Sequence, residues 1–366
     1  MSEPPNVSAE RPRPIVFDYE FDEIDKGFIT DRLRTPLDAV RQEQILERVA
    51  SIAAASKPAG FAFDAARESA QQRIVHVPVE AIDRPLFFVG DIHGDLLAAE
   101  TVLHYLLLQA EHGEAPIAVF LGDYIDDGPN SADVCLRVLE RAMLDPARTC
   151  LLPGNHDLAL QLDGSRFRSE VSPSDFSDWL NEEPAASSSR KLGALLPGFF
   201  QLLPRALFFP NGLFAAHGGF PHTDLLEQIR SKDDLESENC LQDFVWTRAH
   251  PRARRKLPNR TSKGCQFGWE DFDRFCDAAS AALSRPVQTM VRGHDHVDGG
   301  WSDYPDYPRP ALTTVNALTH RLGREVGAEY VKPICLLRYH LEAPIQVHRL
   351  HLGDDFVRKF CPEPVE

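Results

Sequence analysis

The sequence predicts an α/β fold in which two β-sheets pack as a sandwich flanked by helices. Strands and helices alternate from residue 86 to residue 154. Apolar runs between residues 286 and 352 read mainly as strands. Early alternation followed by late strands favours a two-sheet sandwich over a barrel. The 366 residues can bury a large core, as one large domain or two smaller ones.

The N-terminal part is predicted to differ in character from the main body. The first stretch, residues 1–35, is rich in Pro, Asp, Glu and Arg, so we expect a poorly ordered arm. Residues 36–84 are expected to pack on the main domain as an extension of helix and strand. In it, residues 35–56 open with Thr-Pro and carry apolar residues at helical spacing. Residues 73–90 read as a strand, a turn and a second strand of the buried type.

The predicted main domain covers residues 85–355, and residues 356–366 are expected to form a tail. A polar segment at 172–191 is expected to be a surface insertion. The elements before it are predicted as helix 96–108, strand 116–122, helix 131–144 and strand 148–154. After it we predict a helix running into a strand at 192–209, and strands at 212–219, 286–294, 311–316, 334–341 and 345–352.

Charge and cysteine usage limit the classes of function. A formal net charge of −16 argues against a nucleic acid scaffold and against anionic membranes as partners. No apolar run approaches the roughly 20 residues that span a bilayer, and the N-terminus has no apolar stretch typical of a secretory signal. Seven cysteines without a CxxC pair favour reduced thiols. We therefore expect a cytoplasmic protein that recognises phosphate, if at all, only locally.

Polar clusters follow five of the predicted strands. Loops at the carboxyl ends of strands converge on the ligand site in open α/β sheets. Together these clusters would offer about six or seven nitrogen and oxygen ligands, an inventory for two divalent first-row ions rather than for zinc held by thiolates or calcium held by oxygen alone. The clusters are Gly90-Asp91-Ile92-His93-Gly94, Gly122-Asp123-Tyr124-Ile125-Asp126, Gly154-Asn155-His156-Asp157, His217-Gly218-Gly219 and Gly293-His294-Asp295-His296.

These motifs, in this order, resemble the calcineurin-like metallophosphoesterase superfamily. The motif residues are most similar to those of its serine/threonine phosphoprotein phosphatase branch, of which this chain would be a divergent member. The match spans residues 84–350. The resemblance implies the metallophosphoesterase fold and a binuclear metal-dependent phosphoesterase. It further implies a phosphomonoesterase that acts by metal-activated hydroxide attack on a phosphorylated protein or a small phosphoester.

The resemblance also implies a role for each motif residue. Asp91 and His93 would bind the first metal, and Asp123 would bridge both, since a carboxylate has two oxygens for two cations. Asn155, His217 and His294 would bind the second metal, with Asn155 also contacting the substrate. Manganese is the first choice of metal, and iron, zinc or cobalt suit the same ligands.

Three further histidine and aspartate assignments complete the expected site. His156 would be the general acid that protonates the leaving alkoxide. Asp126 would orient His156 and stabilise its imidazolium form. His296 would join the first metal, as in GHxH patterns of the wider superfamily, or else lie at the surface or behind the ligands. Asp95 is predicted to cap the following helix, and Asp157 to be a cap or a partner of the ligands.

Departures from the family pattern concern the substrate. Asp127 stands where the family carries a phosphate-binding arginine, and Ala317 where eukaryotic members carry a tyrosine. The basic run 248–260 could compensate, with Arg260 as the candidate phosphate ligand, or could be a solvated loop. Arg292, directly before Gly293-His294, could lie within reach of the site or could have a structural role only.

Two other readings of the function stay open. A dinucleoside polyphosphate hydrolase, or a phosphodiesterase or other hydrolase of phosphodiesters or anhydrides, would use the same metal site, and the missing arginine makes this alternative more plausible. A catalytically silent binding module would dock an acidic partner on the basic run. The sequence identifies no regulatory partner.

Overall fold

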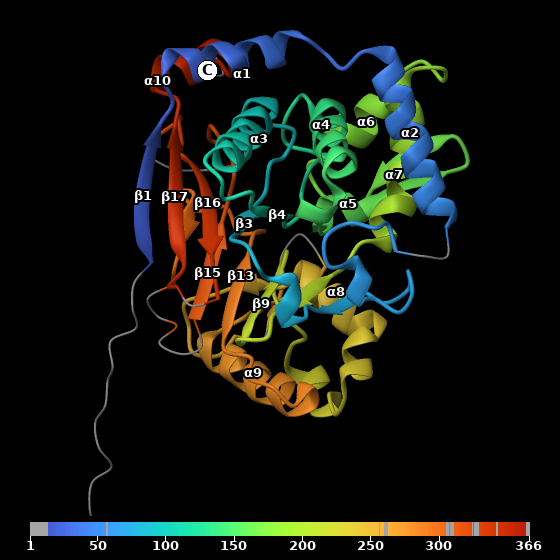
Figure 1. Ribbon diagram of the computed structural model, residues 1–366. Coiled ribbons are helices and arrows are strands. Elements are labelled where there is room, and N and C mark those ends of the chain that lie inside the picture. The colour runs from blue at the N-terminus through green and yellow to red at the C-terminus, as the bar shows by residue number, and fades with distance from the viewer. Residues whose placement is uncertain are drawn as a thin grey trace, which may run out of the picture.

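The structure is a computed structural model that describes residues 14–55, 58–255, 257–259, 263–304, 307, 311–323, 325, 329–341 and 343–363. Two large sheets pack face to face, with helices on both outer faces (Figure 1). Within the described chain the strand order is β1-β17-β16-β3-β4-β5 in the first sheet and β14-β15-β13-β9-β8-β2 in the second. The predicted two-sheet α/β sandwich is confirmed.

The strands are short, and most have few polar side chains. The first sheet contains β1 (Ile15–Glu20), β17 (Gln346–His351), β16 (Ile334–Tyr339), β3 (Leu86–Val89), β4 (Ile117–Phe120) and β5 (Thr149–Leu151). The second contains β14 (Trp301–Ser302), β15 (Ala311–Val315), β13 (Thr289–Arg292), β9 (Leu213–Ala216), β8 (Ala206–Phe208) and β2 (Ile74–His76). Smaller sheets are formed by β6 (Leu160–Asp163) with β7 (Arg166–Ser169), and by β10 (Arg248–Ala249), β11 (Leu257–Pro258) and β12 (Cys265–Phe267).

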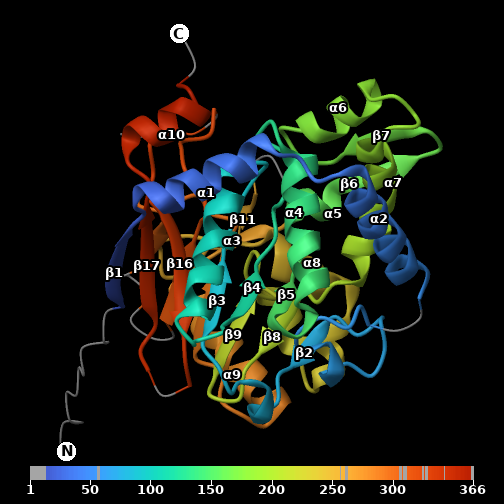
Figure 2. The same ribbon diagram turned by 45° about the horizontal axis from the view of Figure 1, so that its top comes forward.

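The helices divide between the two outer faces of the sandwich (Figures 1 and 2). Near the first sheet lie α1 (Glu23–Arg34), α2 (Ala39–Ala54), α3 (Leu96–Glu111), α4 (Ser131–Leu144), α5 (Asn155–Ala159), α6 (Asp175–Glu182) and α7 (Ser188–Leu202). Near the second lie α8 (Glu238–Trp246) and α9 (Trp269–Leu283). The chain then ends with α10 (Asp354–Phe360).

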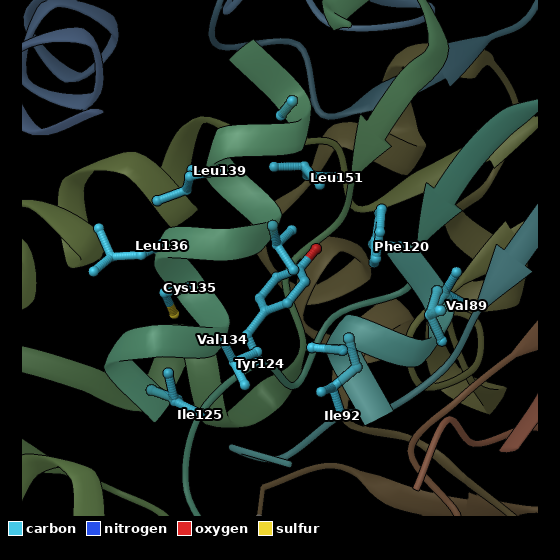
Figure 3. Packing of buried hydrophobic residues seen from close by; sticks show 14 of the residues in the cluster. Val89, Ile92, Phe120, Tyr124, Ile125, Val134, Cys135, Leu136, Leu139 and Leu151 are labelled. Carbon is cyan, nitrogen blue, oxygen red and sulfur yellow. The ribbon is translucent and has the colours of Figure 1, made fainter. Parts of the chain in front are cut away.

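The period of two along each strand explains the layering. Phe88 of β3 faces the space between the sheets, where Leu207 of β8 and Val291 of β13 pack in the same cluster. The next residue, Val89, faces the helices instead, and Figure 3 shows it near Phe120 on the side of α4. Strands buried on both faces therefore show no polar alternation, as the sequence indicates for β3 and β4.

The parallel strands set the place of the polar clusters. β3, β4 and β5 are parallel neighbours in the first sheet, and β9 and β13 are parallel neighbours in the second. Their carboxyl ends lie at the same edge of the sandwich, so the five clusters that follow them meet there.

The prediction of a poorly ordered arm over residues 1–35 is wrong for residues 14–35. Strand β1 pairs in parallel with β17 at the edge of the first sheet, and Asp22 caps α1 with a side-chain bond to the Ile24 amide at 2.8 Å. The alternation in Ile15–Glu20 is local, and the Pro-rich and charged average of residues 1–35 conceals it. Residues 1–13 of the predicted arm lie outside the described residues.

Two other expectations need correction or stay open. The polar segment 172–191 contains α6, which buries Phe176 and Leu180 against α7, so it is not merely a surface loop. Helix α10 crosses the expected start of the tail at residue 356. The domain boundaries at residues 85 and 355 stay predictions. Among the described residues, no helix combines the length and apolar character needed to cross a bilayer.

A buried arginine ties α1 to the helices beneath it. Arg137 of α4 donates to the carbonyl oxygens of Arg32 (2.9 Å) and Thr35 (2.6 Å). It also lies 2.6 Å from the carboxylate of Glu100 in α3, with side-chain exposures of 4% and 2%. A buried ion pair that loses one partner leaves a charge without compensation.

We predict that Arg137→Met lowers the free energy of unfolding by roughly 3 kcal/mol, because two carbonyl groups lose a buried donor and Glu100 keeps only one of its two arginine partners, Arg32. Urea denaturation followed by circular dichroism measures it. Arg168→Met, on an arginine that is 61% exposed, is the matched control and should change stability by less than about 0.5 kcal/mol. Equal effects of the two variants would contradict the prediction.

Candidate metal centre

The five clusters meet where the parallel strands of both sheets end. Each side chain comes from a loop directly after its strand, so the position of every group is set by the sheet rather than by a long flexible connection. The sequence-predicted residues found together there are Asp91, His93, Asp123, Asp126, Asn155, His156, His217, His294 and His296.

The first group consists of Asp91, His93 and His296, whose potential ligand atoms all lie within 4.8 Å of one another. His296 Nε2 is 3.4 Å from Asp91 Oδ2. The rings of His93 and His296 are 4.9 Å apart between centroids. His93 Nδ1 lies 3.0 Å from the Ile125 carbonyl oxygen, which directs Nε2 toward the group. This arrangement could hold one cation.

The second group consists of Asp123, His217 and His294, again within 4.8 Å of one another. His217 Nε2 is at its centre, 3.1 Å from His294 Nδ1 and 3.3 Å from Asp123 Oδ2. Asn155 belongs to the same place, because its Oδ1 is 3.0 Å from His217 Nε2. Four nitrogen and oxygen ligands thus surround a second possible cation position.

Asp123 lies between the two groups. Its Oδ2 is 3.4 Å from His93 Nε2 and 3.3 Å from His217 Nε2. Its Oδ1 accepts a hydrogen bond from the His156 amide at 2.9 Å, which fixes the carboxylate plane. A carboxylate in this position can serve cations on both sides.

The chemistry of the two groups fits divalent first-row cations. His93 Nε2, which faces the first group, is buried and has no hydrogen-bond partner among the described residues. Burial lowers the pKa of His93 to about 3 and that of His294 well below its ordinary value. Both imidazoles therefore remain neutral at pH 7, the form that can donate a lone pair to a metal.

Neighbouring charges shift the pKa values of the carboxylates and of the other imidazoles in the centre. Burial would raise the pKa of Asp123, but the adjacent His217, His156 and His93 hold it well below its ordinary value. Burial would lower the pKa of His296, yet Asp91 and Glu325 raise it to about 9. A cation that binds His296 therefore has to displace a proton.

Backbone strain concentrates at these loops. Residues with positive φ include His93 (47°), Asp123 (56°), Asp126 (66°), Asp127 (65°) and His294 (67°). Such conformations cost free energy in residues other than glycine and occur often at functional sites. Glycine is needed at Gly154, where a Cβ would collide with the Asp123 carboxylate.

A buried carboxylate, Asp157, provides acceptors for three buried amides of these loops. Asp157 accepts hydrogen bonds from the amides of Gly154 (2.7 Å), Asp123 (2.8 Å) and Tyr124 (3.1 Å). Burial and the adjacent Asp123 raise its pKa to about 7. The structure thus confirms a supporting role for Asp157. Asp95 caps α3 through the Ala98 amide at 2.9 Å, as predicted.

His156 and Asp126 form a pair beside the two groups. His156 Nδ1 is 2.8 Å from Asp126 Oδ2, and Asp126 Oδ1 accepts from the Phe176 amide at 3.1 Å. Burial raises the pKa of Asp126 to about 6, against the opposing effect of His156. The His156 ring lies 4.9 Å from the ring of His93, so its position is adjacent to the first group.

The substrate-related expectations have mixed outcomes. The Asp127 side chain is 4% exposed, and its Oδ2 lies 3.7 Å from His93 Nδ1. The Asp127 amide donates to Asp175 at 3.0 Å.

The other substrate-related residues differ in their surroundings. Ala317 is buried and donates its amide hydrogen to the Asp91 carbonyl oxygen. Arg292 is buried and donates to Asp295 and Thr314, so its contacts are structural. Arg260 lies outside the described residues.

Sequence reasoning missed several supporting residues. Asn316 accepts from the Val297 amide at 2.9 Å and pairs with Asp91 in an isolated parallel bridge. Arg248 donates to the His294 carbonyl oxygen at 3.0 Å and to Asp295. Its place at the start of the basic run was the only available signal. Glu325 and Lys332, which contact each other behind His296, stand in a segment without any motif.

Comparison with known proteins gives consistent similarities. Residues 84–298, more than half of the chain, match the sequence profile of the calcineurin-like phosphoesterases. A PP2A-like serine/threonine-protein phosphatase from Candida albicans is 26% identical over 231 residues, which cover 61% of this chain and 50% of that protein. The serine/threonine-protein phosphatase 4 catalytic subunit from Saccharomyces cerevisiae is 27% identical over 242 residues, covering 63% and 72% of the two chains.

The chain spans only about half the length of some curated relatives it matches, 50% of the Candida protein and 46% of a probable serine/threonine-protein phosphatase from Encephalitozoon cuniculi. Among solved structures, a protein serine/threonine phosphatase from Saccharomyces cerevisiae superposes with a TM-score of 0.57 at 16% identity. This superposition covers 86% of this chain and 90% of that chain, so the two share a fold.

We predict that Asp157→Asn lowers the free energy of unfolding by about 1–3 kcal/mol at pH 8, because an amide NH₂ group would face backbone donors that now have an acceptor. Asp163→Asn, at a side chain that is 66% exposed, is the control with the same change. Urea denaturation of both proteins decides the matter, and unchanged stability of the Asp157 variant would show that the three amides do not need the carboxylate.

Proposed function

The chain belongs to the calcineurin-like phosphoesterase family, and from that premise we propose that it is a binuclear metal-dependent phosphatase of the serine/threonine phosphoprotein phosphatase type. The observation that carries the proposal is the place of Asp123 Oδ2, 3.4 Å from a nitrogen of the first group and 3.3 Å from a nitrogen of the second. The similarity to protein phosphatases from fungi supports a phosphoprotein or a small phosphomonoester as substrate.

In this proposal the two groups divide the cations between them. Asp91, His93 and His296 hold the first, while Asn155, His217 and His294 hold the second, and Asp123 contacts both. Such a pair supplies Lewis acidity toward the phosphoryl oxygens and lowers the pKa of a bound water. We propose manganese, with iron, zinc and cobalt suited to the same nitrogen and oxygen ligands. A cytoplasmic location stays a prediction.

The protein's own groups would complete the reaction. His156 gives a proton to the leaving alkoxide through Nε2, because Nδ1 is held by Asp126 at 2.8 Å. Asp126 in turn stabilises the charged imidazolium. The Asn155 amide would direct its NH₂ group to a phosphoryl oxygen, while its Oδ1 faces His217. Arg260 as a further phosphate ligand stays a prediction.

A second candidate function is favoured by Asp127. Its carboxylate lies beside His93, and a phosphomonoester dianion is repelled by it more strongly than a phosphodiester monoanion. Unit charges about 8 Å apart interact by on the order of 2 kcal/mol at an effective dielectric constant of about 20. The same centre could therefore act on a phosphodiester or a dinucleoside polyphosphate.

We predict that His156→Asn lowers kcat by about 10²–10⁴-fold with a phosphoserine peptide, because the serine alkoxide needs a proton to leave. The loss should be smaller with p-nitrophenyl phosphate, whose leaving group needs less help. Metal content by mass spectrometry should stay at the wild-type value in His156→Asn and fall in Asp123→Asn. A wild-type protein without turnover for any metal and any pH would contradict the proposed function.

We predict that Asp127→Asn lowers KM for p-nitrophenyl phosphate by roughly tenfold and changes KM for bis(p-nitrophenyl) phosphate less, because one repulsive charge acts on a dianion and on a monoanion. Asp178→Asn, an exposed aspartate of α6, makes the same charge change away from His93. A panel that adds diadenosine tetraphosphate ranks the two candidate functions. Equal effects on both esters would dismiss Asp127 as the source of selectivity.

A further inference from the structure

A glutamate far from every motif lies behind His296. Glu325 stands in the segment between β15 and β16, and its Oε1 is 2.9 Å from His296 Nδ1. Its other oxygen, Oε2, is held by two donors, the Lys332 ammonium at 2.6 Å and the Leu322 amide at 2.9 Å. The Glu325 side chain is 13% exposed and that of Lys332 6%. The carboxylate is thus fixed from behind and faces the imidazole.

The opposite side of the imidazole faces the first group. His296 Nε2 is 3.4 Å from Asp91 Oδ2, and Asp91 Oδ1 and Oδ2 also receive the His294 amide at 2.9 and 3.0 Å. Lys332, Glu325, His296 and Asp91 therefore form a continuous chain of polar contacts that ends at the proposed first cation.

We propose that Glu325 is a positioning residue that holds the His296 ring in the orientation and tautomer needed to ligate the first cation. The inference rests on the proposed function, since it requires that His296 is a ligand. An imidazole that ligates through Nε2 carries its proton on Nδ1, and the Glu325 carboxylate at an ion-pair distance of 2.9 Å from Nδ1 favours a proton at that nitrogen. Such partners also make the ligand nitrogen more basic.

Lys332 has a defined part in this arrangement. A carboxylate buried beside a dense group of acids would add to their mutual repulsion unless a cation offsets its charge. The buried ammonium at 2.6 Å provides that offset and restricts the carboxylate to one rotamer. Glu325 can then orient His296 without adding net negative charge to the centre.

The alternative is that Glu325 only fastens its own segment through Lys332 and Leu322. The two roles differ in what depends on His296. A residue that acts through the imidazole loses its effect when the imidazole is absent, whereas a residue that fastens a loop keeps it. A double-mutant cycle with metal affinity as the readout therefore separates them.

The experiment measures Mn²⁺ affinity by calorimetry with a competing chelator, on metal-free full-length protein. The variants are Glu325→Ala, Glu325→Gln, Lys332→Met, His296→Ala and the double variant His296→Ala/Glu325→Ala. Glu329→Gln, at an exposed glutamate of the same segment, is the matched control. Melting of each metal-free protein is recorded beside the titrations.

We expect Glu325→Ala to weaken one of two Mn²⁺ sites by about 10–100-fold. Glu325→Gln, which keeps an acceptor for Nδ1–H, should restore part of the loss, and Lys332→Met should weaken the same site less than Glu325→Ala. In the His296→Ala background the Glu325→Ala change should add less than about twofold. The control should bind as wild type, and the metal-free proteins should melt at similar temperatures.

Other results overturn the inference in distinct ways. Wild-type affinity in Glu325→Ala, or full additivity in the double variant, rejects the positioning role and leaves the proposed function intact. Loss of melting temperature in metal-free Glu325→Ala and Glu325→Gln together assigns Glu325 to loop fastening. A wild-type protein that binds no Mn²⁺ rejects the proposed function and this inference with it.

Discussion

The structure depends on one junction, at Asp91, where the two sheets are joined. Its backbone follows β3 of the first sheet, yet its carbonyl oxygen accepts from the Ala317 amide, which follows β15 of the second. Its carboxylate accepts from the His294 amide, which follows β13 of the same second sheet. A single residue thus holds the loop ends of two separately formed sheets at hydrogen-bond distance. A second contact, between His217 Nδ1 after β9 and the Leu121 carbonyl oxygen after β4 at 3.0 Å, joins the same two edges, so that the two groups of ligands lie on either side of Asp123.

Burying the carboxylates at this junction costs free energy, and hydrogen bonds from neighbouring groups offset part of that cost. Asp91, Asp123 and Asp157 are buried to within 1% of full exclusion from water, where an unpaired carboxylate is strongly disfavoured. Backbone amides satisfy Asp157 completely and Asp91 in part. Asp123 accepts from one backbone amide, that of His156, and its Oδ2 faces only the imidazoles of His93 and His217 among the contacts described above, which makes it the group with most to gain from a cation. Strained backbone at His93, Asp123 and His294 points the same way, because packing around the loops maintains conformations that the isolated segments would not keep.

A feature of the fold or of the site could be predicted from the sequence only where its signal is local along the chain. Glycine next to Asp, Asn or His after an apolar run is a local signal, so the nine residues of the centre could be named from sequence, and the alternation of strands and helices gave the sandwich. The order of β1 beside β17 could not be read, because pairing across more than three hundred residues leaves no local trace. Glu325 was invisible for a related reason. Its partner His296 is 29 positions away, and the segment around it, although it contains Gly323 and Gly327, matches none of the motifs that identify the other residues.

Charge explains how an acidic protein could accept a phosphorylated substrate at all. The formal net charge of −16 repels phosphate at long range, but screening confines that field to roughly 8–10 Å at physiological ionic strength. Inside the centre, Asp91 and Asp123 bring two negative charges, and two divalent cations would bring four positive ones. Lys332 offsets the negative charge of Glu325, whereas Asp127 adds a negative charge at the position where the family carries an arginine. With both cations bound, the net charge of the centre would therefore be slightly positive, and Asp127 would reduce it on the side of His93. A site of this kind would discriminate between substrates by their charge rather than by their shape.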